Sequence, residues 1–154
     1  MLSPTDPIDI VARTLWGEAR GEGQTGMHAV GCVIMNRASV AKRYYATHGK
    51  RHPLFGDGGL IGVCQAPQQF SCWLRSDPNR VKLERVTDED PDFEIALKIA
   101  RHVYAMDLEP IVGGCTHYLT DTLYHSAACP SWAKGMKLYR VLGRHVFLLD
   151  KPSV

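Results

Sequence analysis

The stretch DPIDIVARTLWGEARGEG, residues 6–23, decides how the amino-terminal part of the chain folds. Asp6 followed by Pro7 is typical of a helix start, because aspartate caps free backbone N–H groups and proline fits the first helical position. The apolar residues that follow recur every three or four positions, which is the spacing of one buried helical stripe; they are Ile8, Val11, Ala12 and Leu15. Gly21 and Gly23 end this pattern. The stretch therefore predicts an amphipathic helix that runs into a glycine-rich turn.

Two further helices are expected from the same periodicity. The first covers residues 24–40, with a stripe made of Met27, Val30, Gly31 and Ile34. A glycine on such a stripe indicates close packing against another helix. The second begins at Pro91 after Asp90, and its apolar face consists of Phe93, Ala96, Leu97, Ala100, Val103 and Tyr104.

The remaining segments carry turn-forming residues. Residues 42–62 combine basic side chains with one proline and several glycines, which predicts a surface loop. Its positive charge would attract an anionic polymer, although a solvated loop is the simpler interpretation. After Asp107 the pattern indicates short strands and turns. With no repeat and no low-complexity linker, the sequence predicts one α+β, mainly helical domain over residues 1–154, with a small β element.

Length and composition bound the class of protein. A chain of 154 residues has the size of one domain and needs no partner to bury a core, so a monomer is expected. Its amino terminus lacks the pattern of a signal peptide, and no apolar run is long enough to span a membrane. We therefore expect synthesis in the cytoplasm and no membrane insertion. The cysteines are odd in number and irregularly spaced, so at least one should be a free thiol; they are Cys32, Cys64, Cys72, Cys115 and Cys129.

Glu18 is the candidate catalytic residue. It lies three positions after Leu15, so its carboxyl group should project near the apolar stripe and be partly desolvated. Desolvation raises the pKa of a carboxyl group and allows it to hold a proton near neutral pH. The alternative is a helix-end glutamate that pairs with Arg13 or Arg20.

Five blocks of the chain resemble the SleB-type cell wall hydrolase family, the catalytic domain of spore cortex-lytic enzymes. They are TLWGEARGEGQTGMHAVGCVIMNR (14–37), QAPQQFSCW (65–73), GGCTHYL (113–119), PSWA (130–133) and GRHVF (143–147). The resemblance implies a lysozyme-like, mainly helical catalytic domain with Glu18 as the essential acid. It also implies peptidoglycan glycan strands as the substrate, cleaved between N-acetylmuramic acid and N-acetylglucosamine. No nucleic-acid partner, metal or cofactor is expected.

The same blocks supply candidate substrate-binding residues. Sugar rings stack on aromatic faces and are oriented by amide and hydroxyl groups. The residues that the resemblance places beside the cleft are Gln69, Phe70, Ser71, Trp73, Thr116, His117, Tyr118 and Trp132. Two alternatives remain open: Phe70 and Trp73 are also suited to the hydrophobic core, and His117 to a structural role.

The course of the reaction depends on a second carboxylate opposite Glu18. The sequence offers four candidates, Glu22, Asp57, Asp77 and Asp121, none in a position that marks it as catalytic. A single-carboxylate reaction is therefore favoured, in which the C6 hydroxyl of the muramic acid attacks its own anomeric carbon. This is lytic transglycosylation and gives 1,6-anhydro products. Hydrolysis by water, as in a muramidase, is the alternative.

Three rival functions are weaker. A cysteine amidase or peptidase would use Cys64 or Cys72 with His117 or His145, but no local motif activates a thiol. A zinc amidase would use four ligands whose spacing matches no recognised zinc pattern; they are Cys115, His117, His125 and Cys129. The third rival is a non-catalytic wall-binding phage module, against which the presence of Glu18 speaks.

The chain also departs from the family pattern. Spore enzymes are exported and typically carry an added wall-binding repeat, and this sequence shows neither. We therefore expect a phage or prophage endolysin that reaches the cell wall after release, with a bacterial housekeeping enzyme as the alternative. Residues 43–60 exceed the expected length, and form either a wall of the cleft, with Tyr44 and Tyr45 as added sugar-stacking sites, or a floppy surface excursion.

Overall fold

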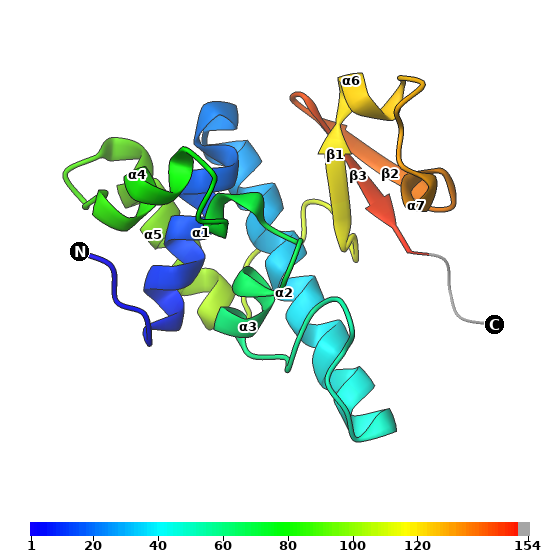
Figure 1. Cartoon of the computed structure of the whole chain (residues 1–154), viewed down its shortest axis with the longest axis horizontal. Coiled ribbons are helices and arrows are strands. Elements are labelled where there is room, and N and C mark those ends of the chain that lie inside the picture. The colour runs from blue at the N-terminus through cyan, green and yellow to red at the C-terminus, as the bar shows by residue number, and fades with distance from the viewer. Residues whose placement is uncertain (151–154) are drawn as a thin grey trace.

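A computed structural model describes residues 1–150 as a layer of helices beside a small three-stranded sheet (Figure 1). The helical layer consists of α1 (Pro7–Ala19), η1 (Arg20–Glu22), α2 (Gly23–His48), α3 (Leu60–Gln65), η2 (Ser71–Trp73), α4 (Asn79–Arg85) and α5 (Pro91–Tyr104). The sheet region consists of β1 (His117–Thr120), α6 (Asp121–Tyr124), α7 (Ser131–Lys134), β2 (Lys137–Leu142) and β3 (His145–Leu149). The predicted α+β, mainly helical class is confirmed.

The first helix lies at the centre of the helical layer, where α2, α3, α4 and α5 all pack against it. It begins as predicted, because the Asp6 side chain accepts a hydrogen bond of 3.0 Å from the backbone N–H of Ile8. Val11, Ala12 and Leu15 of the predicted stripe are fully buried. Helix α1 is therefore enclosed by its neighbours along most of its length.

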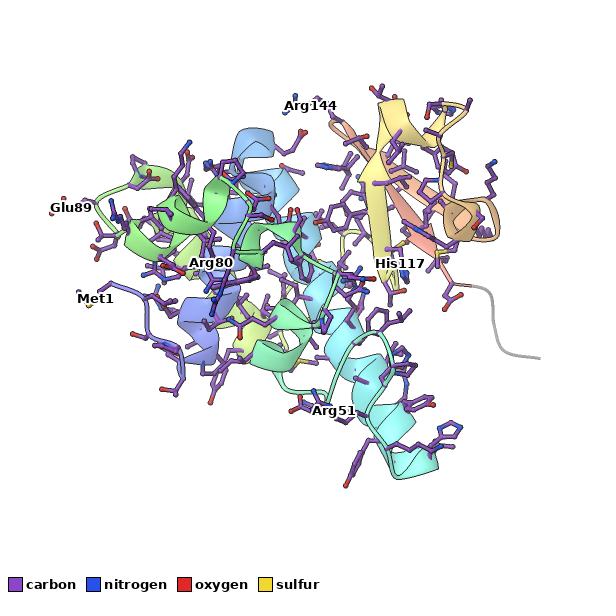
Figure 2. The ribbon with its side chains drawn as sticks, in the orientation of Figure 1. Met1, Arg51, Arg80, Glu89, His117 and Arg144 are labelled. Atoms are coloured by element: carbon purple, nitrogen blue, oxygen red, sulfur yellow. The ribbon has the colours of Figure 1, made fainter. Side chains whose placement is uncertain are left out.

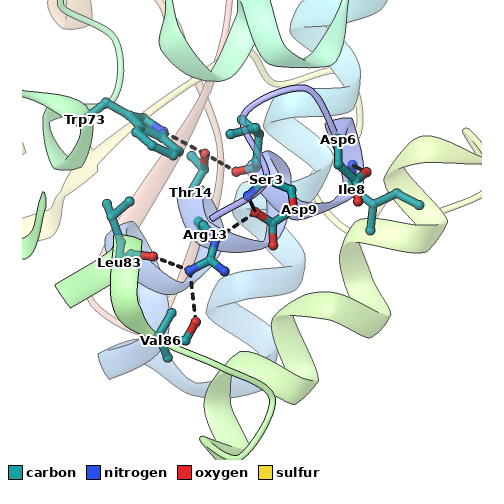
Figure 3. Close-up of polar contacts among 10 residues, drawn as sticks. Ser3, Asp6, Ile8, Asp9, Arg13, Thr14, Trp73, Leu83 and Val86 are labelled. Carbon is teal, nitrogen blue, oxygen red and sulfur yellow. Dashed lines mark hydrogen bonds and ion pairs between the residues drawn. The ribbon is translucent and has the colours of Figure 1, made fainter. Parts of the chain in front are cut away.

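Two buried polar side chains of α1 fix the neighbouring segments (Figure 3). The Arg13 guanidinium donates to the carbonyl oxygens of Leu83 and Val86, at the end of α4. The Thr14 hydroxyl accepts a hydrogen bond of 2.9 Å from the indole N–H of Trp73 in η2. Because unpaired polar groups are costly in a core, these bonds define the positions of α4 and η2 relative to α1.

Close packing of α2 against α5 depends on Gly31, as the sequence predicted. A Cβ atom at this position would lie 3.0 Å from the Cγ2 atom of Ile99 and 3.0 Å from the Cδ2 atom of Leu108. The predicted apolar face of α5 was too wide, since Tyr104 is 57% exposed. The buried stripe follows Ala100 and Val103, and Tyr104 lies at its edge, one residue further around the helix.

The predicted loop over residues 42–62 was too long. Helix α2 continues to His48, because no helix-breaking residue occurs before Gly49, which ends the helix in a left-handed conformation (φ 67°). Figure 1 shows these last turns extending beyond the other helices. The true loop, residues 49–59, is anchored by the buried side chain of Phe55. A floppy excursion is therefore the wrong interpretation for this segment.

The sheet packs on both of its faces. Its strands are antiparallel in the order β1-β3-β2. Tyr118 and Phe147, which pair in register, pack against the core of the helical layer. Val146 and Leu148 alternate to the opposite face and form a second cluster with Ala133 of α7.

The sheet is joined to the helical layer through residues 113–116. The Asn36 side-chain amide donates to the carbonyl oxygens of Gly113 and Cys115, both at 2.9 Å. Next to it, Arg37 Nε donates to the carbonyl oxygen of Thr116 at 2.7 Å. These three bonds hold the segment that leads into β1 against the middle of α2.

The cysteines are all free thiols, and four of them are buried. This agrees with the expectation from their number and spacing. Within residues 1–150, no helix combines the length and the apolar character that crossing a membrane requires.

The glycine at position 31 gives a test of the helix packing. Replacing Gly31 by leucine should lower the free energy of unfolding by about 1–3 kcal/mol, because the added side chain overpacks the contact with α5. Urea unfolding followed by circular dichroism measures this change. Ala46→Leu, at an exposed position of the same helix, is the matched control. Equal stability of the two variants would contradict the packing described for Gly31.

Candidate active site

A cleft of about 600 Å³ separates the carboxyl end of α1 from the sheet. Its lining comes from both layers and consists of Glu18, Arg37, Leu54, Gln68, Gln69, Ser71, His117, Tyr118, Trp132, Met136 and Asp150. A second hollow of about 410 Å³ is lined by Glu18, Gly21, Glu22, Thr120, Thr122, Arg144 and His145. Glu18 is common to both hollows. The groove therefore has two arms that meet at this carboxyl group, a shape that suits a chain-like ligand.

Glu18 has an environment that favours its protonated form. Burial raises the pKa of its carboxyl group to about 7, and the negative charge of Asp77 acts in the same direction. The positive charge of Arg37 and the backbone N–H groups of Ser71 and Cys72 act in the opposite direction. At neutral pH this carboxyl group is therefore partly protonated and can either donate or accept a proton.

The alternative role of Glu18, pairing with Arg13 or Arg20, does not occur. Arg13 forms its ion pair with Asp9 at 2.8 Å. Arg20 donates to the carbonyl oxygen of Trp16 and to the side chain of Asn79. Both guanidinium groups are thus engaged elsewhere, which leaves Glu18 directed toward the cleft.

Gly17 explains how the backbone of η2 comes so close to Glu18. A Cβ atom at position 17 would lie 2.9 Å from the Cβ atom of Cys72 and 3.1 Å from its sulfur. Only glycine leaves room for this approach, and the approach brings the N–H groups of Ser71 and Cys72 to the carboxyl group. Gly17 is therefore needed for the environment of Glu18.

Arg37 lies in the same cleft and was not predicted as a site residue. Its side chain is 4% exposed, and its guanidinium carbon lies 5.0 Å from the ring centroids of both Phe55 and Phe70. Burial lowers its pKa to about 10, so it remains a cation at neutral pH. A sequence signal was present, since Arg37 is the one charged residue within the apolar stretch 29–41.

Five of the predicted substrate-binding residues line the cleft together with Glu18: Gln69, Ser71, His117, Tyr118 and Trp132. Trp132 is 44% exposed, and its ring centroid lies 5.2 Å from that of His117. Figure 2 shows His117 on β1, at the side of the sheet that faces the helices. Burial lowers the pKa of His117 to about 4, so its imidazole is neutral at physiological pH.

The other three predicted residues do not line the cleft: Phe70, Trp73 and Thr116. Phe70 is 3% and Trp73 is 9% exposed. Their rings belong to the hydrophobic core, where Phe70 supports Arg37 and Trp73 is bonded to Thr14. Thr116 is buried as well, with its carbonyl oxygen bonded to Arg37. The assignment of these three residues to direct sugar contact is therefore corrected to support of the cleft.

The candidate second carboxylates lie in different places. Glu22 lines the smaller arm but forms an ion pair of 2.7 Å with Arg144, which lies at the β2–β3 turn (Figure 2). Asp121 lies 3.2 Å from His125, and Asp57 lines a separate pocket beside Pro7 and Lys42. Asp77 acts on the Glu18 charge but lines neither arm. Asp150, which was not predicted, lines the larger arm.

The long segment 43–60 contributes one wall of the cleft through Leu54, which is 48% exposed. The two tyrosines expected as added stacking sites line neither arm. Tyr44 stacks instead on His48, with ring centroids 4.2 Å apart. Tyr45 is exposed on α2.

The thiols are poorly suited to nucleophilic catalysis. Burial raises the pKa of the Cys64 thiol to about 12, and it raises that of Cys72 further still. Of the two proposed bases, His117 Nδ1 is bonded to Thr116, and His145 faces Glu22. Within residues 1–150, no three side chains of the His, Cys, Asp or Glu types gather as a metal-binding group, so the four candidate zinc ligands are not brought together.

A buried carboxyl group with a raised pKa that lines two adjoining hollows marks this region as the candidate active site. The chain belongs to the Cell Wall Hydrolase family, whose sequence model matches residues 21–148. The matched range begins just after Glu18, so the case for this residue comes from the geometry.

Two solved structures share the fold. One is the catalytic domain of the germination-specific lytic transglycosylase SleB from Bacillus anthracis. It is 21% identical, with a TM-score of 0.65 over 94% of this chain and 95% of that one. The other, the catalytic domain of the Bacillus cereus SleB protein, is 20% identical, with a TM-score of 0.63 over 93% and 89% of the two chains. A comparison with curated proteins found no match.

The raised pKa of Glu18 predicts a pH-dependent stability. The folded protein holds this proton up to about pH 7, whereas the unfolded chain releases it near the ordinary value of 4.5. Ionisation therefore disfavours the folded state increasingly between pH 4.5 and 7. Glu18→Gln removes the ionisation and should stabilise the protein by about 1–3 kcal/mol at pH 8, with a much smaller effect at pH 4. Urea unfolding at both pH values measures the difference. A Glu18→Gln variant no more stable than the parent at pH 8 would mean that the carboxyl group is well hydrated.

Proposed function

We propose that this protein cleaves the glycosidic bond between N-acetylmuramic acid and N-acetylglucosamine in peptidoglycan, with Glu18 as the acid and then the base. The observation that carries the proposal is the carboxyl group of Glu18, which burial keeps partly protonated near pH 7 at the junction of the two arms. Membership of the Cell Wall Hydrolase family supports the substrate class. The similar fold of a domain named as a lytic transglycosylase supports the type of bond.

The reaction begins when a glycan strand occupies both arms with the scissile bond above Glu18. The carboxylic acid donates its proton to the bridging oxygen as the bond from that oxygen to the anomeric carbon breaks. A positioned proton donor of this kind contributes about 10² to 10⁴ in rate. The sugar left in the other arm carries the positive charge of an oxocarbenium-like state, and Glu18 is now a carboxylate.

The second half of the reaction uses the same carboxylate as a base. Glu18 accepts the proton of the C6 hydroxyl group of the muramic acid while that oxygen bonds to the anomeric carbon. The product is a 1,6-anhydro sugar, and Glu18 is returned to its acid form without the use of water. This course needs only one carboxylate in the site.

The electrostatics of the cleft support a single-carboxylate reaction. A nucleophile in a retaining glycosidase would lie about 5 Å from the acid, close enough to shift its pKa strongly. Asp150 and Glu22 line the groove, yet neither is among the main causes of the raised pKa of Glu18. Asp77 does contribute, but it lines neither arm and accepts a hydrogen bond from the backbone of Asn79. Hydrolysis would replace the C6 hydroxyl by a water molecule and remains the alternative outcome.

The other cleft residues suit the binding of amino sugars. The exposed face of Trp132 can stack on a pyranose ring. Gln69, Ser71 and Tyr118 present amide and hydroxyl groups near Glu18. The neutral imidazole of His117, whose pKa is lowered by burial, can donate or accept a hydrogen bond but carries no charge to compete with the acid.

Digestion of purified peptidoglycan tests both the bond and the chemistry. Glu18→Gln should reduce the rate of strand cleavage by about 10² to 10⁴ while the protein stays folded. Glu94→Gln, at an exposed position of α5, is the control and should cleave at the parental rate. Mass spectrometry of the released fragments should show anhydro ends, which are one water lighter than reducing ends. Reducing ends alone would establish hydrolysis, and full activity of Glu18→Gln would refute the role of this residue.

The rate should also depend on pH through the same group. The acid form of Glu18 starts the reaction, and its pKa is about 7. We therefore expect kcat/KM to fall about tenfold for each pH unit above that value. Initial rates on soluble glycan strands between about pH 5 and about pH 9 give the profile. A rate that stays constant across this range would exclude Glu18 as the proton donor.

A further inference from the structure

One buried donor in the cleft has no partner within the protein. Among residues 1–150, Nη1 of Arg37 is the buried side-chain nitrogen without a hydrogen bond. Arg37 is one of the residues that line the larger arm of the groove, together with Glu18. A buried polar group left unpaired costs about 1–3 kcal/mol, and more when it is charged. Such a group in a ligand cleft indicates that a ligand completes its bonding.

The rest of the side chain is firmly held. Arg37 Nε is bonded to the carbonyl oxygen of Thr116, and the rings of Phe55 and Phe70 lie on the guanidinium. None of the ion pairs in residues 1–150 involves Arg37. The free donor is therefore fixed in direction and is not neutralised by a carboxylate. This combination suits the binding of a specific oxygen atom rather than a general attraction of anions.

The chemistry of the donor selects the kind of oxygen. A guanidinium only donates, so its best partner is an atom that only accepts, such as an acyl oxygen. Sugar hydroxyl groups both donate and accept, and they are less discriminating partners. In muramic acid, acyl oxygens occur on the 2-acetamido group and on the 3-lactyl group that carries the peptide stem.

We propose that Arg37 donates a hydrogen bond to an acyl oxygen of the muramic acid residue whose anomeric carbon reacts, and so places the scissile bond above Glu18. This inference rests on the proposed function and adds a specificity-determining contact to it. It also gives a reason for the separation of Arg37 from Glu18: an ion pair between them would stabilise the carboxylate and remove the proton donor. Arg37 instead remains available to the substrate.

The test compares the parent with Arg37→Lys, which keeps the charge but loses the fixed planar donors, on three glycan substrates. These are intact strands, chemically de-N-acetylated strands, and strands freed of peptide stems by an amidase, which leaves a lactyl carboxylate. On intact strands kcat/KM should fall about 10- to 100-fold. Glu94→Gln on α5 is again the matched control and should lose nothing.

The pattern across substrates identifies the oxygen. If the acetamido oxygen is bound, the loss caused by Arg37→Lys should vanish on de-N-acetylated strands and persist on stem-free strands. If the lactyl carbonyl is bound, the loss should persist on de-N-acetylated strands and grow on stem-free strands, because a free carboxylate pairs more strongly with a guanidinium. A loss that is the same within twofold on all three substrates, or no loss on intact strands, would overturn the proposal and leave Arg37 a structural residue.

Two further measurements distinguish loss of the Arg37 contact from misfolding of the variant and from failure of the proposed function. Binding of intact strands to Glu18→Gln and to the double variant Glu18→Gln, Arg37→Lys, by calorimetry, should differ by about 10- to 100-fold in Kd without any cleavage. If the lysine variant does not fold, the parent alone decides. Its rate must be at least tenfold lower on de-N-acetylated strands if the acetamido oxygen is bound, or at least tenfold higher on stem-free strands if the lactyl carbonyl is bound. Equal rates on all three refute the contact. A parent that fails to cleave intact strands would refute the proposed function instead.

Discussion

The hydrogen bonds from Asn36 and Arg37 to residues 113–116 are the contact on which the rest of the structure depends. They fix the segment that enters β1 on the middle of α2, and the sheet follows from that segment through its pairing with β3. Only in this position do His117 and Tyr118 lie opposite the carboxyl end of α1. The cleft therefore depends on the hydrogen bonds that α2 donates to these three carbonyl oxygens.

The same arrangement sets the chemistry of Glu18. A carboxyl group at the exposed end of a helix would have an ordinary pKa, but the sheet and η2 remove much of its water. The opposing effects of Asp77, Arg37 and the backbone of η2 leave its pKa near neutrality. A group poised in this way can serve as acid and base in turn, and the folded state bears the free-energy cost of its burial. Function and stability are in conflict at this one side chain.

The block QAPQQFSCW (residues 65–73) contains residues that line the cleft and residues that only support it. Gln69 and Ser71 reach the cleft, whereas Phe70 and Trp73 turn into the core between and beside them. Their burial is still required for the site, because Phe70 lies against the guanidinium of Arg37, and Trp73 fixes η2 through Thr14. Residues of one short loop are therefore divided between substrate contact and structural support by the direction of each side chain.

The sequence by itself determined the local elements and singled out the candidate acid. Helical periodicity, the cap at Asp6, the helix start at Pro91 and the close packing at Gly31 depend on neighbours close in the chain or on residue size, so they were predicted correctly. The tertiary structure alone decided which predicted site residues reach the cleft. In β1 and the segment that leads into it, Tyr118 lines the cleft, whereas Thr116 is buried. It also decided the position of Arg37, whose partners Thr116, Phe55 and Phe70 come from distant parts of the chain. The physical reason is that burial and hydrogen bonding between distant segments arise only when those segments meet.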